Sequence, residues 1–371
     1  MSKYISISFP GRLALQQRVI PAYRTSFINL LAKSCKKGLT VFAGQPLPIE
    51  GIGLADQLDS AEITNTKNHH FHDPQSSLYL CWQQGVIDWL KSQDPDALIV
   101  EANPRYLSTR NAIRWIKSRN RPVLGWGLGA PRGGNPVEQF FRLTFLRSLD
   151  GVIAYSQRGA NEYRSLGLGN VFVANNAVTP RPKQQPPERP LTQKDKSTVL
   201  FIGRLQKRKR IDILVQGCAS LPKALQPHLI IVGDGPESTK LRTLAVQIYP
   251  TTNFVGAKHG PELAPYFAEA DLFALPGTGG LAVQEAMSHG LPVLVAQGDG
   301  TQDDLVRKEN GWQVSPGDQN AFTSALHDAL SDIKKLREMG NNSYRIVTEE
   351  INLETMVGSF VEALNAIRHK V

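Results

Sequence analysis

The sequence predicts an α/β protein with two doubly wound domains, each a parallel sheet covered by helices on both faces. Three observations lead to this class. Short apolar runs alternate with amphipathic stretches, a length of 371 residues suits two domains, and a proline-rich segment divides the chain. With 41% hydrophobic and 20% charged residues, the chain can bury sizeable cores.

The apolar runs predict the strands of both halves. In the second half we expect strands at 198–202, 229–232, 272–275 and 292–296, and helices near 211–220, 237–248, 262–269 and 281–289. In the first half we expect strands near 13–19, 97–101, 122–126, 151–155 and 171–174. Strands that alternate with helices in this way favour parallel sheets.

The best domain boundary is the segment from Thr179 to Leu191, which holds five prolines and cannot join a sheet. We therefore expect a first domain over 1–180, a linker over 181–197 and a second domain over 198–352. We expect a terminal helix over 353–371, and one possibility is that it crosses back to the first domain.

Composition excludes disorder, collagen-like repeats and a disulfide scaffold as whole-chain descriptions. Cys35, Cys81 and Cys218 are far apart and odd in number, which suits reduced thiols in a cytosol. No apolar run is long enough to span a membrane, and the first 17 residues lack the apolar core of a secretory signal. We expect a cytoplasmic protein, or one peripheral at the inner face of the membrane.

The net charge of +9 is concentrated between Arg105 and Arg147, where nine basic residues face one acid. Such a surface attracts phosphates, or it is a solvated basic face. A basic helix over 108–121 carries Ile113, Trp115 and Ile116 among its cations. It suits contact with an anionic membrane, although the interpretation in which these apolar residues face the core is slightly favoured. Nucleic acid is not expected, because no recognition motif accompanies the charge.

Two loops that follow predicted strands have the chemistry of a phosphate site. After 198–202, Gly203 permits a tight turn, and five cations occupy 204–210, among them Arg204 and Lys209. A guanidinium at a strand end can bind two phosphate oxygens, and an ammonium adds a mobile charge. Ligands bind beyond the carboxyl ends of parallel strands, so this run fits an anion site as well as it fits an ordinary solvated charged face.

The second loop follows 272–275 and contains Gly277, Thr278, Gly279 and Gly280 before a helix that begins at Leu281. Backbone amides and the helix dipole at this point can hold a phosphate. Glu285 lies one turn further along the same helix face. A carboxylate repels phosphate but accepts hydrogen bonds from two ribose hydroxyls. Together the loops predict a site for a nucleoside diphosphate.

Three motifs of the second half resemble the donor-binding half of family 4 retaining glycosyltransferases (glycosyl transferases group 1). They are Gly203-Arg204-Leu205 with Lys209 and Asp212, Gly233-Asp234-Gly235-Pro236, and Gly280-Leu281 with Glu285-Ala286-Met287 and Gly290-Leu291-Pro292-Val293. The resemblance spans about 199–318, and it is looser in the first half, through Gln17–Arg24 and Val173–Ala177. It implies the GT-B fold, in which two Rossmann-like domains face each other across a cleft.

The resemblance also implies roles for these residues. Arg204 and Lys209 would be the catalytic cations that stabilise the leaving diphosphate, and Glu285 would bind the ribose. The other donor-binding positions are Gly203, Thr278, Gly279, Gly280 and Leu281. At the acceptor or cleft side we expect Tyr23, Arg24, Asn103, Arg105 and Trp126.

The implied reaction moves a hexose-type sugar from a nucleotide-diphosphate sugar, a UDP- or GDP-sugar, to a glycan or lipid-linked acceptor. It proceeds with retention and without a metal or cofactor. Two positions depart from the family pattern: Gly277 stands where a second glutamate is common, and Leu128 where a histidine is often found. Two alternatives therefore stay open, a non-catalytic nucleotide-sugar-binding protein of the same fold and a GT-B nucleotide-sugar epimerase.

Three weaker signals are set aside. His69, His70 and His72 are expected in a loop, because adjacent histidines point in different directions. Asp94-Pro95-Asp96 precedes a strand, at the wrong end for a cleft, and is rejected as a metal site. The glycine pattern over 125–130 is followed by prolines and glycines instead of a helix, which disfavours NAD binding.

Overall fold

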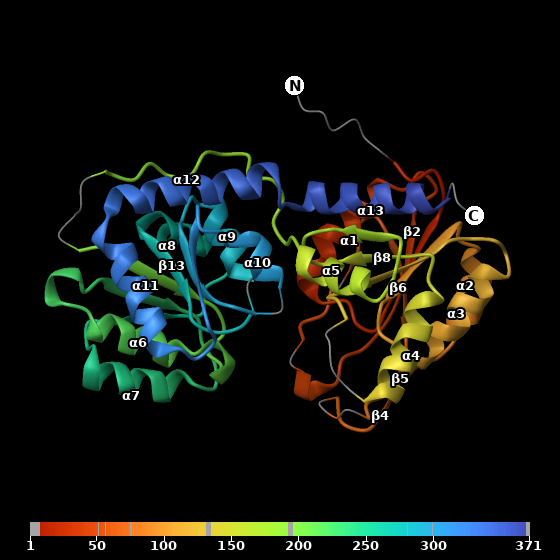
Figure 1. Ribbon diagram of the computed structural model, residues 1–371, viewed down its shortest axis with the longest axis horizontal. Helices are drawn as coiled ribbons and strands as arrows, with labels where there is room; N and C mark the ends of the chain where they lie inside the picture. Colours follow the sequence, from red (N-terminus) through yellow and green to blue (C-terminus); the bar gives the residue numbers. More distant parts are fainter. Residues whose placement is uncertain are drawn as a thin grey trace. The chain divides into compact units, whose positions relative to one another are not determined.

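The structure is a computed structural model that describes residues 8–368 except 51, 56, 75, 77, 131–134, 192–195, 280 and 299. The chain divides into two compact units, one of Met1–Val178 with Leu353–Val371 and one of Thr179–Asn352. Each unit contains a parallel sheet (Figure 1). In the described part of the chain, no helix is long and apolar enough to cross a bilayer.

The first unit has a seven-stranded parallel sheet in the order β3-β2-β1-β6-β7-β8-β9. Its strands are β1 (Leu13–Gln17), β2 (Leu39–Gly44), β3 (Glu62–Thr66), β6 (Ala97–Glu101), β7 (Val123–Gly127), β8 (Gly151–Ala154) and β9 (Val171–Val173). Its helices are α1 (Thr25–Lys33), α2 (Val86–Gln93), α3 (Leu107–Lys117), α4 (Pro136–Arg147), α5 (Gln157–Ser165) and α13 (Leu353–Arg368). The strand order reverses between β1 and β6, so ligands are expected beyond the carboxyl ends of these two strands.

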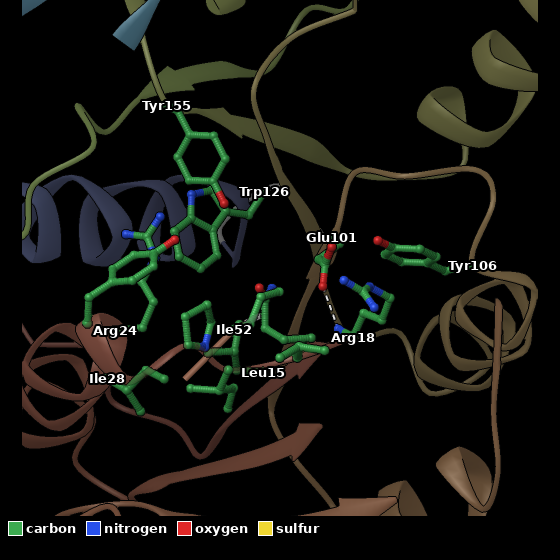
Figure 2. Close-up of a pocket in the computed structure, with 14 residues that line it drawn as sticks. Leu15, Arg18, Arg24, Ile28, Ile52, Glu101, Tyr106, Trp126 and Tyr155 are labelled. Atoms are coloured by element: carbon green, nitrogen blue, oxygen red, sulfur yellow. Dashed lines mark hydrogen bonds between the residues drawn. The ribbon is translucent and has the colours of Figure 1, made fainter. Parts of the chain in front are cut away.

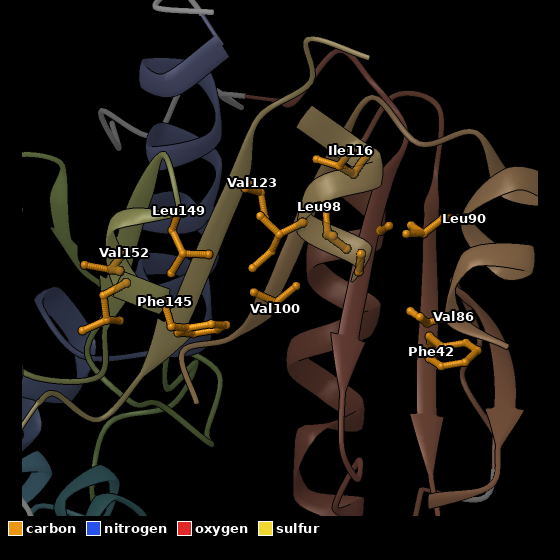
Figure 3. Packing of buried hydrophobic residues seen from close by; sticks show 14 of the residues in the cluster. Phe42, Val86, Leu90, Leu98, Val100, Ile116, Val123, Phe145, Leu149 and Val152 are labelled. Carbon is orange, nitrogen blue, oxygen red and sulfur yellow. The ribbon is translucent and has the colours of Figure 1, made fainter. Parts of the chain in front are cut away.

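Helices cover both faces of this sheet. On one face Leu98 and Val100 of β6 join Ile116 of α3 and Phe145 of α4 in a buried cluster (Figure 3). Successive side chains of a strand point to opposite faces. Accordingly Trp126 of β7 packs on the other face, where its ring lies 5.3 Å from Phe27 of α1 and 5.0 Å from Phe360 of α13.

The second unit has a six-stranded parallel sheet in the order β12-β11-β10-β13-β14-β15. Its strands are β10 (Thr198–Ile202), β11 (His228–Val232), β12 (Asn253–Gly256), β13 (Leu272–Leu275), β14 (Val293–Ala296) and β15 (Gly311–Val314). Its helices are α6 (Ile211–Ser220), α7 (Ser238–Ile248), α8 (Ala264–Glu269), α9 (Leu281–Ser288), α10 (Thr301–Leu305), α11 (Gln319–Ser331) and α12 (Ile333–Glu349). Here the order reverses between β10 and β13.

The proline-rich segment packs within the second unit. Arg189 donates hydrogen bonds to the carbonyls of Phe267, Ala270 and His289 at 2.8–2.9 Å, at the ends of α8 and α9. The same guanidinium thereby satisfies carbonyls that a helix end leaves without an intrahelical partner. Arg337 of α12 continues this arrangement by donating to the carbonyl of Pro190.

The structure adds strands that the apolar runs do not predict. β3, β12 and β15 lie at sheet edges and mix polar with apolar residues, whereas β2 is fully buried. The prediction of a loop at His69–His72 is wrong for most of that segment. Asn68–Phe71 is β4, an antiparallel partner of β5 (Leu80–Gln83), because His70 pairs with Cys81 and hydrogen-bonds the hydroxyl of Tyr79 at 2.7 Å.

Candidate functional site

Two loops of the second unit contact each other where its strand order reverses. The first follows β10 and contains a 3-10 turn, η3 (Lys207–Lys209), and the second runs from β13 to α9. The amide of Thr278 donates to the carbonyl of Arg208 at 3.0 Å. Nζ of Lys209 donates to the carbonyl of Gly279 at 3.1 Å. These bonds hold the cationic turn against the glycine-rich loop.

Gly277 permits this close approach. A Cβ at this position would lie 2.1 Å from the carbonyl oxygen of Arg208 and 2.5 Å from Cα of Lys209, so any side chain would displace the turn. The glutamate that the resemblance leads one to expect here therefore cannot fit between the two loops. The space that a glutamate side chain would need at Gly277 is filled by the backbone of Arg208 and Lys209.

Lys209 carries a positive charge that is not neutralised by a nearby acid. Burial, and after it the charge of Arg208, lowers the pKa of its ammonium to about 8. Among the described residues, Lys209 has no ion pair with a carboxylate. Arg204 is exposed and has no hydrogen bond or ion pair within the same part of the chain. Both cations are thus available to an anion.

Glu285 lies one turn into α9 and is half-buried. Its carboxylate has no hydrogen-bond partner among the residues described, and burial raises the pKa of the group. Leu281, at the start of the helix, is exposed. The structure thus brings Lys209, Thr278 and Gly279 into contact and places Gly203, Arg204, Leu281 and Glu285 after the same two strands. Gly280 lies outside the described residues.

A second site occupies the strand-order reversal of the first unit. A pocket of about 140 Å³ lies beyond β1 and β6 (Figure 2). Tyr23, Arg24 and Trp126, three of the five predicted acceptor-side residues, line it. Asn103 and Arg105 do not: the Asn103 side chain accepts a hydrogen bond from the amide of Arg105 at 3.1 Å, in the turn before α3.

The pocket also contains charged residues that sequence reasoning did not select. The guanidinium of Arg18 pairs with both carboxylate oxygens of Glu50, at 2.7 and 3.0 Å. The amide of Arg18 donates to the carboxylate of Glu101 (Figure 2). Burial raises the pKa of Glu101, and the bond from Arg18 offsets part of that shift. A carboxylate at the carboxyl end of a predicted buried strand was the signal that could have found Glu101.

The basic helix over 108–121 is largely α3, and its apolar side chains face inward. Ile113 and Ile116 are buried in the core, and Trp115 packs against the same cluster. The guanidinium of Arg119 stacks 3.7 Å from the centre of the Trp115 ring. The interpretation in which these apolar residues face the core is confirmed for Ile113 and Ile116, and Trp115 is half-buried.

Comparison with known proteins agrees with this arrangement. Residues 183–346 match the family described as Glycosyl transferases group 1. The second unit carries a glycosyl transferases group 1 domain. The match covers the loops after β10 and β13 and all seven donor-side positions that the structure describes.

Several curated proteins are similar to this chain. The sulfoquinovosyl transferase SQD2 of Arabidopsis thaliana is 31% identical over 52% of this chain and 38% of its own length. The lipopolysaccharide core biosynthesis glycosyltransferase LpsE of Rhizobium meliloti is 26% identical over 59% of this chain and 62% of its own length. A GDP-mannose-dependent alpha-mannosyltransferase of Mycobacterium tuberculosis is 33% identical over 38% and 36%. The chain thus spans less than two thirds of the length of each of these relatives.

Solved structures match nearly the whole chain. Sucrose-phosphate synthase from Thermosynechococcus elongatus superposes with a TM-score of 0.70 at 19% identity, over 97% of this chain and 100% of that one. HepE of Anabaena, in complex with UDP, gives a TM-score of 0.68 at 16% identity, over 96% and 99%. These similarities show the fold. The predicted class, GT-B with two Rossmann-like domains, is confirmed.

Proposed function

We propose that this protein is a glycosyltransferase that moves a hexose-type sugar from a nucleotide-diphosphate sugar to a glycan or lipid-linked acceptor. The second domain binds the donor, and the first binds the acceptor. The observation that carries the proposal is the contact between two loops at one strand-order reversal, where two cations have no acidic partner among the described residues. The group 1 match over the same residues and the transferase names of the relatives support it.

In this proposal the leaving diphosphate meets Arg204, Lys209 and the start of α9. Negative charge develops on the diphosphate as the bond to the sugar breaks, and fixed cations stabilise it without reorganisation. Glu285 accepts hydrogen bonds from the ribose hydroxyls. We propose retention at the anomeric carbon, as the family resemblance implies, with the acceptor hydroxyl entering on the leaving-group face. The scheme assigns no step to a metal.

The nucleotide is proposed to carry uracil or guanine. A relative is named as GDP-mannose-dependent, and a structural neighbour was solved with UDP. Both names support a nucleoside diphosphate without choosing the base. The first experiment therefore compares both.

A thermal-shift panel of UDP, GDP, ADP and NAD tests the donor site. A nucleotide at 100 times its Kd stabilises the folded protein by about 2.7 kcal/mol, which moves the melting transition visibly. We expect one nucleoside diphosphate to raise Tm, and Glu285→Ala to reduce that shift. Glu338→Ala, an exposed glutamate of α12, is the matched control and should leave it unchanged. The donor-site proposal fails if no diphosphate raises Tm.

Turnover separates transfer from the two alternatives. We expect a sugar transferred to an added lipid or glycan acceptor when the donor that raises Tm is supplied. Nucleotide binding without any product or donor hydrolysis would favour the non-catalytic protein. Conversion of the nucleotide sugar without an acceptor, seen by NMR, would favour the epimerase.

We further propose that the first domain works against an anionic membrane, through α4 and not α3. Val137, Phe140 and Phe141 project from the first two turns of α4 with exposures of 61, 67 and 54%. Their spacing places them on one helix face. They lie within the 105–147 stretch that carries a net charge of +8. Exposed aromatic residues beside cations suit the interface of a bilayer with anionic lipids.

Sedimentation with vesicles tests this surface. We expect the protein to sediment with phosphatidylglycerol-containing vesicles and not with pure phosphatidylcholine. Phe140→Ser with Phe141→Ser should abolish sedimentation, whereas Val246→Ser, an equally exposed position on α7, should not. Binding that is the same for both lipids or for both variants would overturn the membrane proposal and leave the donor site untouched.

A further inference from the structure

Arg24 is a buried cation that has no acidic partner in the part of the chain that the structure describes. It ends η1 (Ala22–Arg24) and is 7% exposed. Its guanidinium lies over four aromatic rings, with centroids at 4.8 Å for Trp126, 5.1 Å for Tyr23, 5.4 Å for Tyr155 and 5.9 Å for Phe27. Aromatic faces attract a cation but accept no strong hydrogen bond, so Nη1 has no hydrogen-bond partner within the described residues.

A second unsatisfied donor lies beside it. Trp126 is 3% exposed, and its indole N–H has no acceptor among the described residues. Leaving a buried donor unpaired destabilises the folded state, and the cost is larger for a charged group. Both side chains line the pocket beyond β1 and β6 (Figure 2). Two unsatisfied donors in one pocket indicate that something outside this chain supplies the acceptor atoms.

The other charges of the pocket are already engaged. Arg18 is neutralised by Glu50, and the carboxylate of Glu101 accepts from the amide of Arg18. Burial raises the pKa of Glu101, which favours its neutral form and weakens its repulsion of an anion. The hydroxyls of Tyr106 and Tyr155 also stay protonated, because burial raises their pKa values. Arg24 is therefore the uncompensated charge.

We propose that this pocket binds an anionic group of the acceptor, a phosphate monoester or a carboxylate, through the guanidinium of Arg24 and the indole N–H of Trp126. The inference rests on the proposed function and narrows its acceptor to molecules that carry such a group. A guanidinium presents parallel N–H donors that match two oxygens of either anion. The rings of Trp126 and Tyr155, which are buried and half-buried, lie beside the guanidinium and would exclude part of the water around a bound anion.

The test uses the indole signals of the five tryptophans in ¹⁵N-labelled full-length protein. The Trp126 signal is the one lost in Trp126→Phe. The probes are glycerol phosphate, glycerate and uncharged glycerol, each added at constant ionic strength in a buffer free of phosphate and carboxylate. We expect a saturable shift of the Trp126 signal with at least one charged probe and none with glycerol. The two charged probes distinguish a phosphate from a carboxylate.

Two variants assign the effect. Arg24→Gln should abolish the shift, and Arg114→Gln, an exposed arginine of the same unit, should retain it. The other four indole signals report whether each variant is folded, and the wild-type comparison with glycerol decides the matter even where Arg24→Gln does not fold. A shift that persists in folded Arg24→Gln, or equal shifts with glycerol, would overturn the inference.

A nucleoside diphosphate is the final arm. If it moves the Trp126 signal while neither charged probe does, the pocket serves the donor and the inference is wrong. If it raises Tm through the second unit and no probe moves Trp126, the inference likewise fails while the proposed transferase survives. Loss of the thermal shift with a retained response to a charged probe would instead overturn the donor site alone.

Discussion

The two strand-order reversals of this protein are built in opposite ways. In the second unit, the site after β10 and β13 consists of exposed or half-buried groups on two loops, held together by backbone hydrogen bonds. In the first unit, the pocket after β1 and β6 is lined by aromatic and charged side chains, most of them buried or half-buried, and Arg18 there pairs with Glu50. The same topology thus supports a cation-rich site on two loops and an aromatic pocket.

The two sites also differ in how firmly their cations are held by the rest of the protein. Lys209 donates to one carbonyl and Arg204 makes no hydrogen bond in the described part of the chain, so both keep donors available for the charge that develops on a leaving diphosphate. Arg24 is fixed among four rings, which suits recognition of a charge that does not change. We interpret the first arrangement as catalytic and the second as selective.

The first prediction tests whether the site after β10 and β13 is catalytic. We expect Arg204→Ala and Lys209→Ala each to lower kcat at saturating donor by roughly 10- to 100-fold, because each removes a cation that stabilises the leaving diphosphate. Lys207→Ala removes the same charge two residues away, from an exposed position, and is the control. Near-wild-type kcat in both site variants would remove these cations from catalysis.

The second prediction concerns the contact between the two loops. Gly277→Ala inserts a Cβ 2.1 Å from the carbonyl of Arg208, so the turn that carries Lys209 must move. We expect the free energy of unfolding to fall by about 1–3 kcal/mol. Nucleotide affinity should also fall, by roughly tenfold, equivalent to about 1.4 kcal/mol. Calorimetry and nucleotide titration measure both.

Gly358→Ala is the matched control for that substitution. Apart from its chain neighbours and the backbone of its own helix, no atom of the described residues lies within 4 Å of a Cβ at Gly358, which is inside α13. Alanine in a helix interior is about 1 kcal/mol more favourable than glycine, so this variant should be no less stable than the wild type. Equal stability of the two variants would show that the loops do not depend on a bare backbone at Gly277.

The third and smallest effect is on pH dependence. Burial lowers the pKa of Lys209 to about 8 in the free protein, and a bound diphosphate must raise it again. Donor binding therefore takes up a proton, and affinity should fall as pH rises through this pKa, by at most about tenfold per pH unit. Below it the ammonium is charged and affinity should level off.

Isothermal titration in two buffers of different ionisation enthalpy measures the proton uptake. Lys209→Arg should flatten the profile, because a guanidinium stays charged throughout this range. Lys207→Arg, the matched change at an exposed position, should leave the profile as it is. An affinity that does not change across the pKa of Lys209 would contradict the prediction.

Much of the second unit could be predicted because its signals are local. The runs at 198–202, 229–232, 272–275 and 292–296 agree with β10, β11, β13 and β14 to within one residue at each end. The apolar runs do not predict the edge strands β12 and β15, because an edge strand needs less continuous apolar sequence than a central one. Each of the loops after β10 and β13 is one continuous segment, so its glycines and charged residues can be recognised from the sequence alone.

The sequence by itself determined the fold class and the residues of the two loops that are rich in glycine and cations, because strand length, glycine and charge act over a few neighbouring residues. Tertiary structure decided the rest. It showed that Gly277 admits the backbone of Arg208 and Lys209. It also gathered Arg18, Arg24, Glu101, Trp126 and Tyr155 from four strand ends into one pocket. The family resemblance selected Arg24 and Trp126 but not the other three, because burial and pairing across the sheet arise only when distant segments meet.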